Sequence, residues 1–232
     1  MVLEQLKAGA PRHVLEDDGT RQLAFILCLP LIDGVFATLL VTGAVSTFSQ
    51  MINVAVTIFA GAGALAVLYS ESESREEAVQ MVNNVIPVVL GGALLVALVA
   101  PIFQSLFATG LLKYAAALAV ISISLQLADI DLGDRLPPTA IILTGLLLSY
   151  QGAGSFNLTL SYVQPALVTV ALAVIGLYMA TLLKKYNMNL AYVRYGGALV
   201  LALISLSLLG IEIPRQAGPA IFVLSILVSI KR

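Results

Sequence analysis

The sequence predicts an all-α membrane protein, a polytopic bundle of about eight spanning helices built from inverted repeats of about three helices. Of the 232 residues, 59% are hydrophobic and only 11% are charged, whereas soluble domains are about half apolar and about a quarter charged. The charges are clustered and leave long uncharged runs. A chain in hydrocarbon requires such runs, because each span must satisfy its own backbone hydrogen bonds. A third observation is that one stretch of the sequence recurs.

The predicted spans follow a polar N-terminal segment, 1–22, and belong to a single transmembrane domain, 23–232. The first apolar run is too long and too far from the N-terminus for a signal peptide, so we expect a retained helix. Charges and turn residues bound eight apolar segments, at 23–46, 52–70, 82–108, 112–131, 136–151, 162–186, 194–211 and 217–231. The fifth and eighth segments are short for a bilayer, so seven to eight spans are expected.

The distribution of basic residues predicts the orientation. Cytoplasmic loops are enriched in Lys and Arg. With eight spans and the N-terminus inside, the basic residues expected in the cytoplasm are Lys7, Arg12, Arg21, Arg75, Arg135, Lys184, Lys185, Arg194, Lys231 and Arg232. Those expected outside are only Lys113 and Arg215. The sequence therefore predicts a multi-pass protein of the cell membrane with both termini in the cytoplasm.

An internal repeat aligns 113–132 (KYAAALAVISISLQLADIDL) with 194–213 (RYGGALVLALISLSLLGIEI), without gaps and with eight identical positions. Its basic-aromatic start and acidic end are matched as well as its leucines. A shorter copy, 25–33, places Asp33 over Asp131. Repeat units are expected at about 23–110, 111–193 and 194–232. Units with an odd number of helices cross the membrane in opposite directions, which is typical of secondary transporters.

Asp33 is the first candidate functional residue, since it lies about ten residues into the first span. A carboxylate at that depth costs several kcal/mol unless it is paired, protonated or in contact with water. Pro30 and Gly34 weaken the helix around it and could free backbone carbonyls to bind a cation with it. The alternative is an aspartate that only fixes helix packing.

A second candidate cluster occupies 128–139, with Asp129 and Asp131 at the end of the fourth span. Ser122, Gln126 and Asp129 are spaced to share one helix face, where their oxygens would suit a hard cation or a proton path. Glu212 lies at the equivalent place in the other repeat. Weaker candidates are Asp134, Arg135 and Arg215. The alternative is a solvated turn with a local ion pair.

Several residue types needed for other functions are missing from the spans. The single histidine, His13, precedes the first span, and no lysine lies in a span interior. The chain also lacks a phosphate-binding GxxxxGK[ST] loop and a serine–histidine pair for hydrolysis. We therefore expect no enzyme and no cofactor, and the sequence identifies no metal. Nothing in it suggests nucleic-acid binding.

Two resemblances accompany these motifs. LPLIDGVFATLLVTGA and RYGGALVLALISLSLLGIEIP resemble an uncharacterised archaeal membrane family, best populated in haloarchaea, which implies lineage but no activity. ISLQLADIDLGDRLPPTAIIL is similar to the E-x-G-D-[KR]-[ST] helix of manganese/calcium exchangers in the LysE-type superfamily. Asp131 replaces the glutamate, Gly133-Asp134-Arg135 match, and Leu136 replaces the final hydroxyl residue. The second copy of that motif would keep only Asp33 and Gly34.

The leading functional hypothesis is a secondary transporter or carrier of a small solute, linked to a cation or a proton and using intramembrane carboxylates. The alternative is a membrane scaffold or accessory subunit that transports nothing. The expected partners are the lipid bilayer, a small cation or proton, and a second copy of the chain in a homo-oligomer.

Overall fold

A computed structural model describes residues 18–152, 159–184, 186, 189–214 and 216–230. Within these ranges the chain is all-helical, and an isolated β-bridge joins Phe107 to Tyr150. Its helices are α2 (Asp18–Ile32), α3 (Val35–Val41), α4 (Phe48–Val54), the π-helix η2 (Ala55–Phe59), α5 (Ala62–Ser70), α6 (Arg75–Leu106), α7 (Thr109–Leu127), α8 (Asp131–Asp134), α9 (Pro138–Ser149), α10 (Val163–Leu183), α11 (Leu190–Leu208) and α12 (Ala217–Ser229).

Among the described helices, α6, α7, α10 and α11 are each long and apolar enough to cross a membrane. The count rises to six if each of two bent helix pairs forms one span. The predicted fifth and eighth segments become α9 and α12, which have 12 and 13 residues. At 1.5 Å per residue they fall short of a hydrocarbon core about 30 Å thick. The apolar surface of α9, where Leu147 is 80% exposed, fits contact with lipid.

The two bent pairs are broken helices. α2 and α3 meet at 44°, and Gly34 at the junction has a left-handed φ of +81°, which glycine adopts without strain. The second pair joins Phe48–Phe59 to Gly63–Ser70 at 50°. A π-turn precedes that bend, with Ala60 N donating to the Ala55 carbonyl at 2.8 Å. Such π-turns inside helices often mark functional sites.

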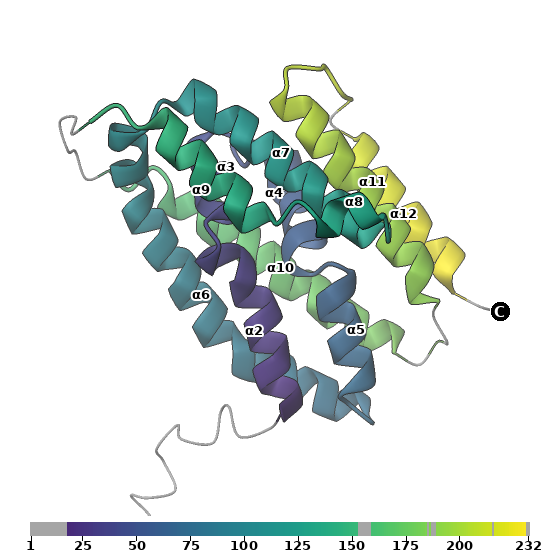
Figure 1. Cartoon of the computed structure of the whole chain (residues 1–232). Coiled ribbons are helices and arrows are strands. Elements are labelled where there is room, and N and C mark those ends of the chain that lie inside the picture. The colour runs from purple at the N-terminus through teal and green to yellow at the C-terminus, as the bar shows by residue number, and fades with distance from the viewer. Residues whose placement is uncertain (1–17, 153–158, 185, 187–188, 215, 231–232) are drawn as a thin grey trace, which may run out of the picture.

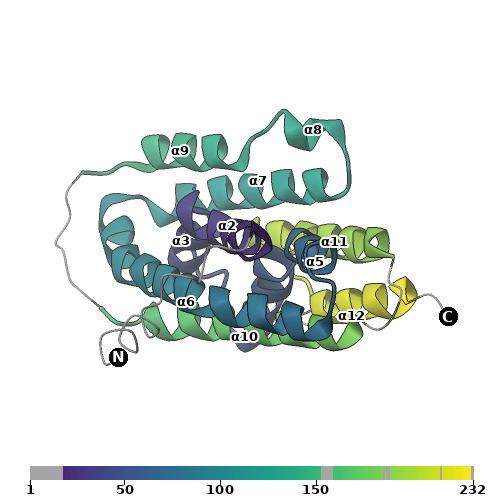
Figure 2. The same ribbon diagram turned by 90° about the horizontal axis from the view of Figure 1, so that it is seen from below.

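The broken helices form the centre of the bundle. Figure 2 shows α2, α3 and α5 between the α6–α10 pair and the α7–α9 pair. All seven residues of α3 are buried. Phe36 of α3 and Phe59 of η2 pack edge to face, with ring centroids 5.0 Å apart. The core therefore holds the two bent segments against each other.

The start of α2 and the start of α7 lie at opposite ends of the bundle (Figure 1). The end that contains the start of α2 also holds the α5–α6 connection, because Gly19 lies against Glu71. The described basic residues of that end are Arg21, Arg75, Arg135, Lys184 and Arg194. Lys113, near the start of α7, lies at the opposite end. The structure thus separates the basic residues as the sequence pattern predicts.

Equivalent contacts recur in two helix units at a spacing close to 81 residues. Ala108 N donates to the Ser149 carbonyl at 2.7 Å, where α6–α7 meets the end of α9. Asn189 N donates to the Ser229 carbonyl at 2.8 Å, where α10–α11 meets the end of α12. α7 packs on α9, α11 packs on α12, and α7 packs on α11. These contacts relate α7–α9 to α11–α12.

Candidate functional site: a polar cavity

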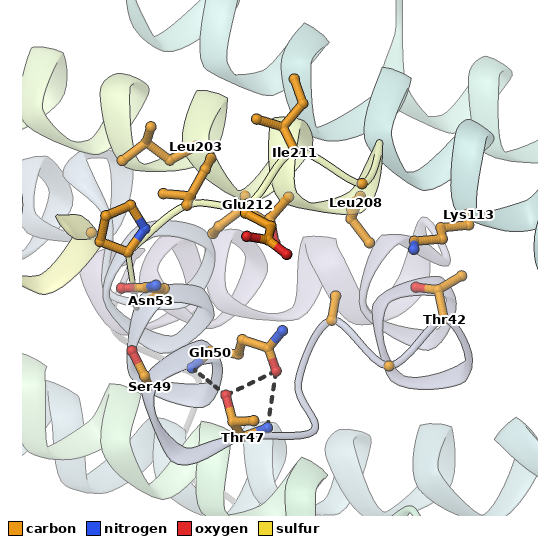
Figure 3. A pocket seen from close by; sticks show the side chains of 18 residues that line it. Thr42, Thr47, Ser49, Gln50, Asn53, Lys113, Leu203, Leu208, Ile211 and Glu212 are labelled. Atoms are coloured by element: carbon orange, nitrogen blue, oxygen red, sulfur yellow. Dashed lines mark hydrogen bonds between the residues drawn. The ribbon is translucent and has the colours of Figure 1, made fainter. Parts of the chain in front are cut away.

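A cavity of about 570 Å³ lies at the Lys113 end of the bundle. It is enclosed by the α3–α4 connection, the α11–α12 connection and the start of α7 (Figure 3). Its uncharged polar lining consists of Thr42, Thr47, Ser49, Gln50, Asn53 and Ser207. Its charged residues are Lys113 and Glu212. Cavities that bind small molecules commonly have this size, and polar side chains dominate the lining of this one.

The wall formed by the α3–α4 connection is fixed by a capping box. Thr47 precedes α4, and the Gln50 backbone N–H donates to its hydroxyl at 3.4 Å. In return, the Gln50 side-chain oxygen accepts from Thr47 N at 3.0 Å. These bonds satisfy free N–H groups at the start of the helix. The polar side chains of this wall are therefore held by a defined helix start.

Asn53 supplies a buried acceptor without a partner. Its Oδ1 has no hydrogen-bond partner within the described part of the chain. Gly218 packs against it so closely that a Cβ there would lie 2.5 Å from Oδ1. An unpaired buried acceptor costs about 1–3 kcal/mol, so a donor is expected to satisfy it. Asn53 lies two residues before the start of the π-helix η2.

The two charged residues of the cavity come from different helix units. Lys113 belongs to the first turns of α7 and is half-buried, and Glu212 lies in the α11–α12 connection. In Figure 3 the Glu212 carboxylate points into the cavity, between Lys113 on one side and Asn53 on the other. Among the described residues no ion pair joins Lys113 to Glu212. The cavity thus presents one cation and one anion that do not neutralise each other by contact.

Asp33 lies away from this cavity, in the break between α2 and α3. It is half-buried, and its Oδ1 accepts a hydrogen bond from Val35 N at 3.0 Å. The described basic residues form no ion pair with it. Asp33 therefore holds the first residue of α3 at the break of the helix through one side-chain hydrogen bond.

The cluster predicted on the fourth span is used in local contacts. Ser122 Oγ donates to the Gly133 carbonyl at 3.3 Å and also to Leu136, and Gln126 Nε2 donates to the same Gly133 carbonyl at 3.0 Å. α7 ends at Leu127, so Asp129 does not continue the helix face expected for Ser122 and Gln126.

The helix ends there because Asp129 takes a left-handed φ of 56°. Its carboxylate forms an ion pair with Arg194 of α11. Asp131, Asp134 and Arg135 are exposed beyond the helix end, and Arg215 lies outside the described residues. No group of three or more His, Cys, Asp or Glu that could hold a metal ion occurs in the ranges that the structure describes.

Of the residues predicted for the site, only Glu212 lines the cavity among those described. The sequence pattern assigns Lys113 only to the outside, because a count of basic residues does not indicate which of them faces a cavity. Asn53 lies within the predicted span 52–70, where no pattern singles it out. The T-x-x-Q spacing of Thr47 and Gln50 is a capping-box pattern and could have located this wall.

Comparisons with known proteins give a family without a known activity. A model described as a family of unknown function (DUF5794) matches residues 88–209, slightly more than half of the chain. No curated protein and no solved structure matches. The family match fits the resemblance to an uncharacterised family, and it carries no evidence on an archaeal source or on cation exchangers. Lys113 lies inside the matched range, while Asn53 and Glu212 lie outside it.

Proposed function

The chain belongs to DUF5794, a family of unknown function, and from its architecture we propose that it is a secondary transporter or carrier of a small solute, linked to a cation or a proton. The observation that carries this proposal is the position of the polar cavity. It lies where the connection between the two broken helices meets the α11–α12 unit. Transporters commonly place their sites between repeats and at interrupted helices.

The equivalent contacts of α7–α9 and α11–α12 support an inverted repeat. α7 starts at the Lys113 end and α11 finishes there, so the two helices run in opposite directions. In this proposal α9 and α12 complete eight crossings as short spans. The separation of basic residues supports an orientation with the N-terminus in the cytoplasm and the cavity on the outer side.

Asp33 is the proposed coupling carboxylate, and Glu212 is the proposed solute-side carboxylate. Asp33 lies at the break of a bent helix and is not neutralised by a described basic residue. An acid at such a break can bind a proton or a small cation and couple it to movement of the half-helix.

A flux assay in proteoliposomes tests this function. The wild-type chain is reconstituted, and uptake of labelled small solutes is followed under imposed Na⁺, K⁺ and proton gradients. We expect gradient-driven uptake of at least one solute, abolished by Asp33→Asn. This substitution keeps a side-chain oxygen for Val35 N and removes the charge. Asp18→Asn, at an exposed acid at the start of the same helix, is the matched control and should transport normally.

The second candidate function is a scaffold, favoured by the structural use of Ser122, Gln126 and Asp129. A scaffold needs its polar groups only for packing. Absence of flux under every gradient, with the protein folded in the liposomes, would favour the scaffold. Normal coupling in Asp33→Asn would remove Asp33 from the mechanism and leave transport intact.

A further inference from the structure

The two helix units differ at one charged position. At the spacing of the repeat, Lys113 corresponds to Arg194, and Asp129 corresponds to Gly210. Arg194 is paired with Asp129. Lys113 has Gly210 at the equivalent place, and no acid forms an ion pair with it among the described residues. One unit therefore carries a basic residue with glycine, and not a carboxylate, at the equivalent partner position.

The helix-ending turn at this position has the same hydrogen-bond pattern in both units. Asp129 and Gly210 both have a left-handed φ, 56° and 94°. In one unit Ile130 N donates to the Leu125 carbonyl at 3.0 Å, and in the other Ile211 N donates to Leu206 at 3.1 Å. The same helix-ending turn is thus formed twice. Only the side chain that would have faced Lys113 is missing.

The cavity lies where that carboxylate is missing. Both Lys113 and Gly210 line it, and a Cβ on Gly210 would meet no atom within 4 Å. Glu212 lines the same cavity, and its carboxylate points into it (Figure 3). The cavity therefore offers a cation, Lys113, to a negative group and an anion, Glu212, to a positive group.

We propose that the cavity binds a small zwitterion of the amino-acid class. Its carboxylate pairs with Lys113, in the role that Asp129 has for Arg194 in the other unit. Its ammonium group pairs with the Glu212 carboxylate. An inorganic anion would satisfy Lys113 and meet the negative charge of Glu212, and a lone cation would meet the positive charge of Lys113. A molecule that carries both charges satisfies both residues.

This inference names the solute of the proposed transporter and so rests on that function, yet binding is measurable without transport. The purified full chain in nanodiscs is titrated by calorimetry with each of the twenty L-amino acids. For an amino acid that binds, such as alanine, propionate and isopropylamine serve as matched ligands that carry only one of its charges. We expect each to bind at least ten-fold more weakly than the zwitterion. Equal binding of propionate would make this a carboxylate site, and absence of binding by all twenty would overturn the proposal.

Gly210→Asp gives the sharpest variant. Asp129 shows that this turn accepts an aspartate, so the variant is expected to fold and to pair its new carboxylate with Lys113. We expect zwitterion affinity to fall at least ten-fold, as in Lys113→Met and Glu212→Gln. Gly152→Asp is the matched control, because Gly152 also has a left-handed φ, +93°, and open space around it. Full affinity in Gly210→Asp would overturn the role of Lys113.

The binding and flux experiments can overturn the two proposals independently of each other. A wild-type chain that binds an amino acid and moves nothing under any gradient contradicts the transporter proposal and leaves the binding site standing. A chain that transports another solute and binds no zwitterion contradicts the inference and leaves the transporter standing.

Discussion

Ser124 and Ser205 make reciprocal hydrogen bonds between α7 and α11. The Ser124 hydroxyl donates to the Ala198 carbonyl at 2.7 Å, and the Ser205 hydroxyl donates to the Ala117 carbonyl at 2.8 Å. The two donors are 81 residues apart in the sequence, and so are the two acceptors. A local two-fold axis between the two antiparallel helices would exchange α7 and α11. The same operation would map one of these hydrogen bonds onto the other.

Both serine bonds are expected to stabilise the pair independently. They are separated by seven residues of α7, or about 10 Å along the helix axis. Ser124→Ala and Ser205→Ala should each lower the free energy of unfolding by about 0.5–1 kcal/mol. The loss in the double variant should equal the sum of the two single losses to within about 0.5 kcal/mol, because the effects of distant substitutions on the free energy of unfolding are additive.

Unfolding in detergent micelles, followed by circular dichroism, measures these losses. Ser105→Ala is the control, since the Ser105 hydroxyl bonds only within its own helix; an equal loss there would contradict the prediction.

A second prediction concerns the tight contact of α7 with α9. Gly145 lies so close to Ala115 that an added Cβ would overlap the Ala115 methyl group. The other unit places its glycine on the opposite helix, because Gly196 corresponds to Ala115 and packs against Ser225. Small residues allow such close helix packing in membranes. Gly145→Ala should therefore destabilise the protein by about 1–3 kcal/mol.

Exchanging the glycine and the alanine across this contact tests whether steric overlap causes the loss of stability. Adding Ala115→Gly to Gly145→Ala should recover most of the loss, measured by thermal unfolding. Gly91→Ala is the control, since a Cβ there meets no atom within 4 Å. If the double variant is no more stable than Gly145→Ala alone, the contact is not what limits the helix approach.

The aromatic pair at the centre of the bundle gives a third prediction. Phe36 and Phe59 are 0% and 1% exposed and join α3 to η2. Phe36→Ala should lower the free energy of unfolding by about 3–5 kcal/mol, since it leaves a cavity between the broken helices. Phe36→Leu should cost less, about 1–2 kcal/mol, because it refills much of that volume. Chemical unfolding of the two variants compares them; similar losses would argue against cavity formation as the cause.

The sequence predicted what depends on composition and periodicity. It located the apolar helices, the separation of basic residues and the correspondence of 113–132 with 194–213, because these are properties of the chain read residue by residue. It also placed a helix break near Pro30 and Gly34, and the structure breaks the helix at Gly34.

The cavity could not be predicted in this way because its walls come from three distant segments. Neither the approach of Asn53 to Gly218 nor the meeting of Lys113 and Gly210 at one cavity leaves a local pattern. Helix ends were also missed where one residue takes a left-handed conformation. Asp129 was expected on a helix face, yet its φ of 56° ends the helix and directs its carboxylate to Arg194.

Asp129 gives the last prediction, since its backbone and charge have separable effects. The ion pair with Arg194 is partly exposed, 65% at Asp129 and 35% at Arg194, and such pairs contribute about 0–1 kcal/mol. Asp129→Asn keeps a residue that tolerates a left-handed φ and loses only the charge, so its loss should stay within that range. Asp129→Ala should lose about 1–2 kcal/mol more, because alanine is strained at this φ.

Asp129→Gly completes the series, because it gives this turn the residue that Gly210 provides in the other unit. Glycine removes the backbone strain, so the variant should be close in stability to Asp129→Asn. Thermal unfolding at low and at high salt separates the two effects. Salt should narrow the gap between wild type and Asp129→Asn, because it screens the ion pair, and should leave the gap between Asp129→Gly and Asp129→Ala unchanged. Equal stability of Asp129→Gly and Asp129→Ala would show that a left-handed φ at this position does not strain the turn.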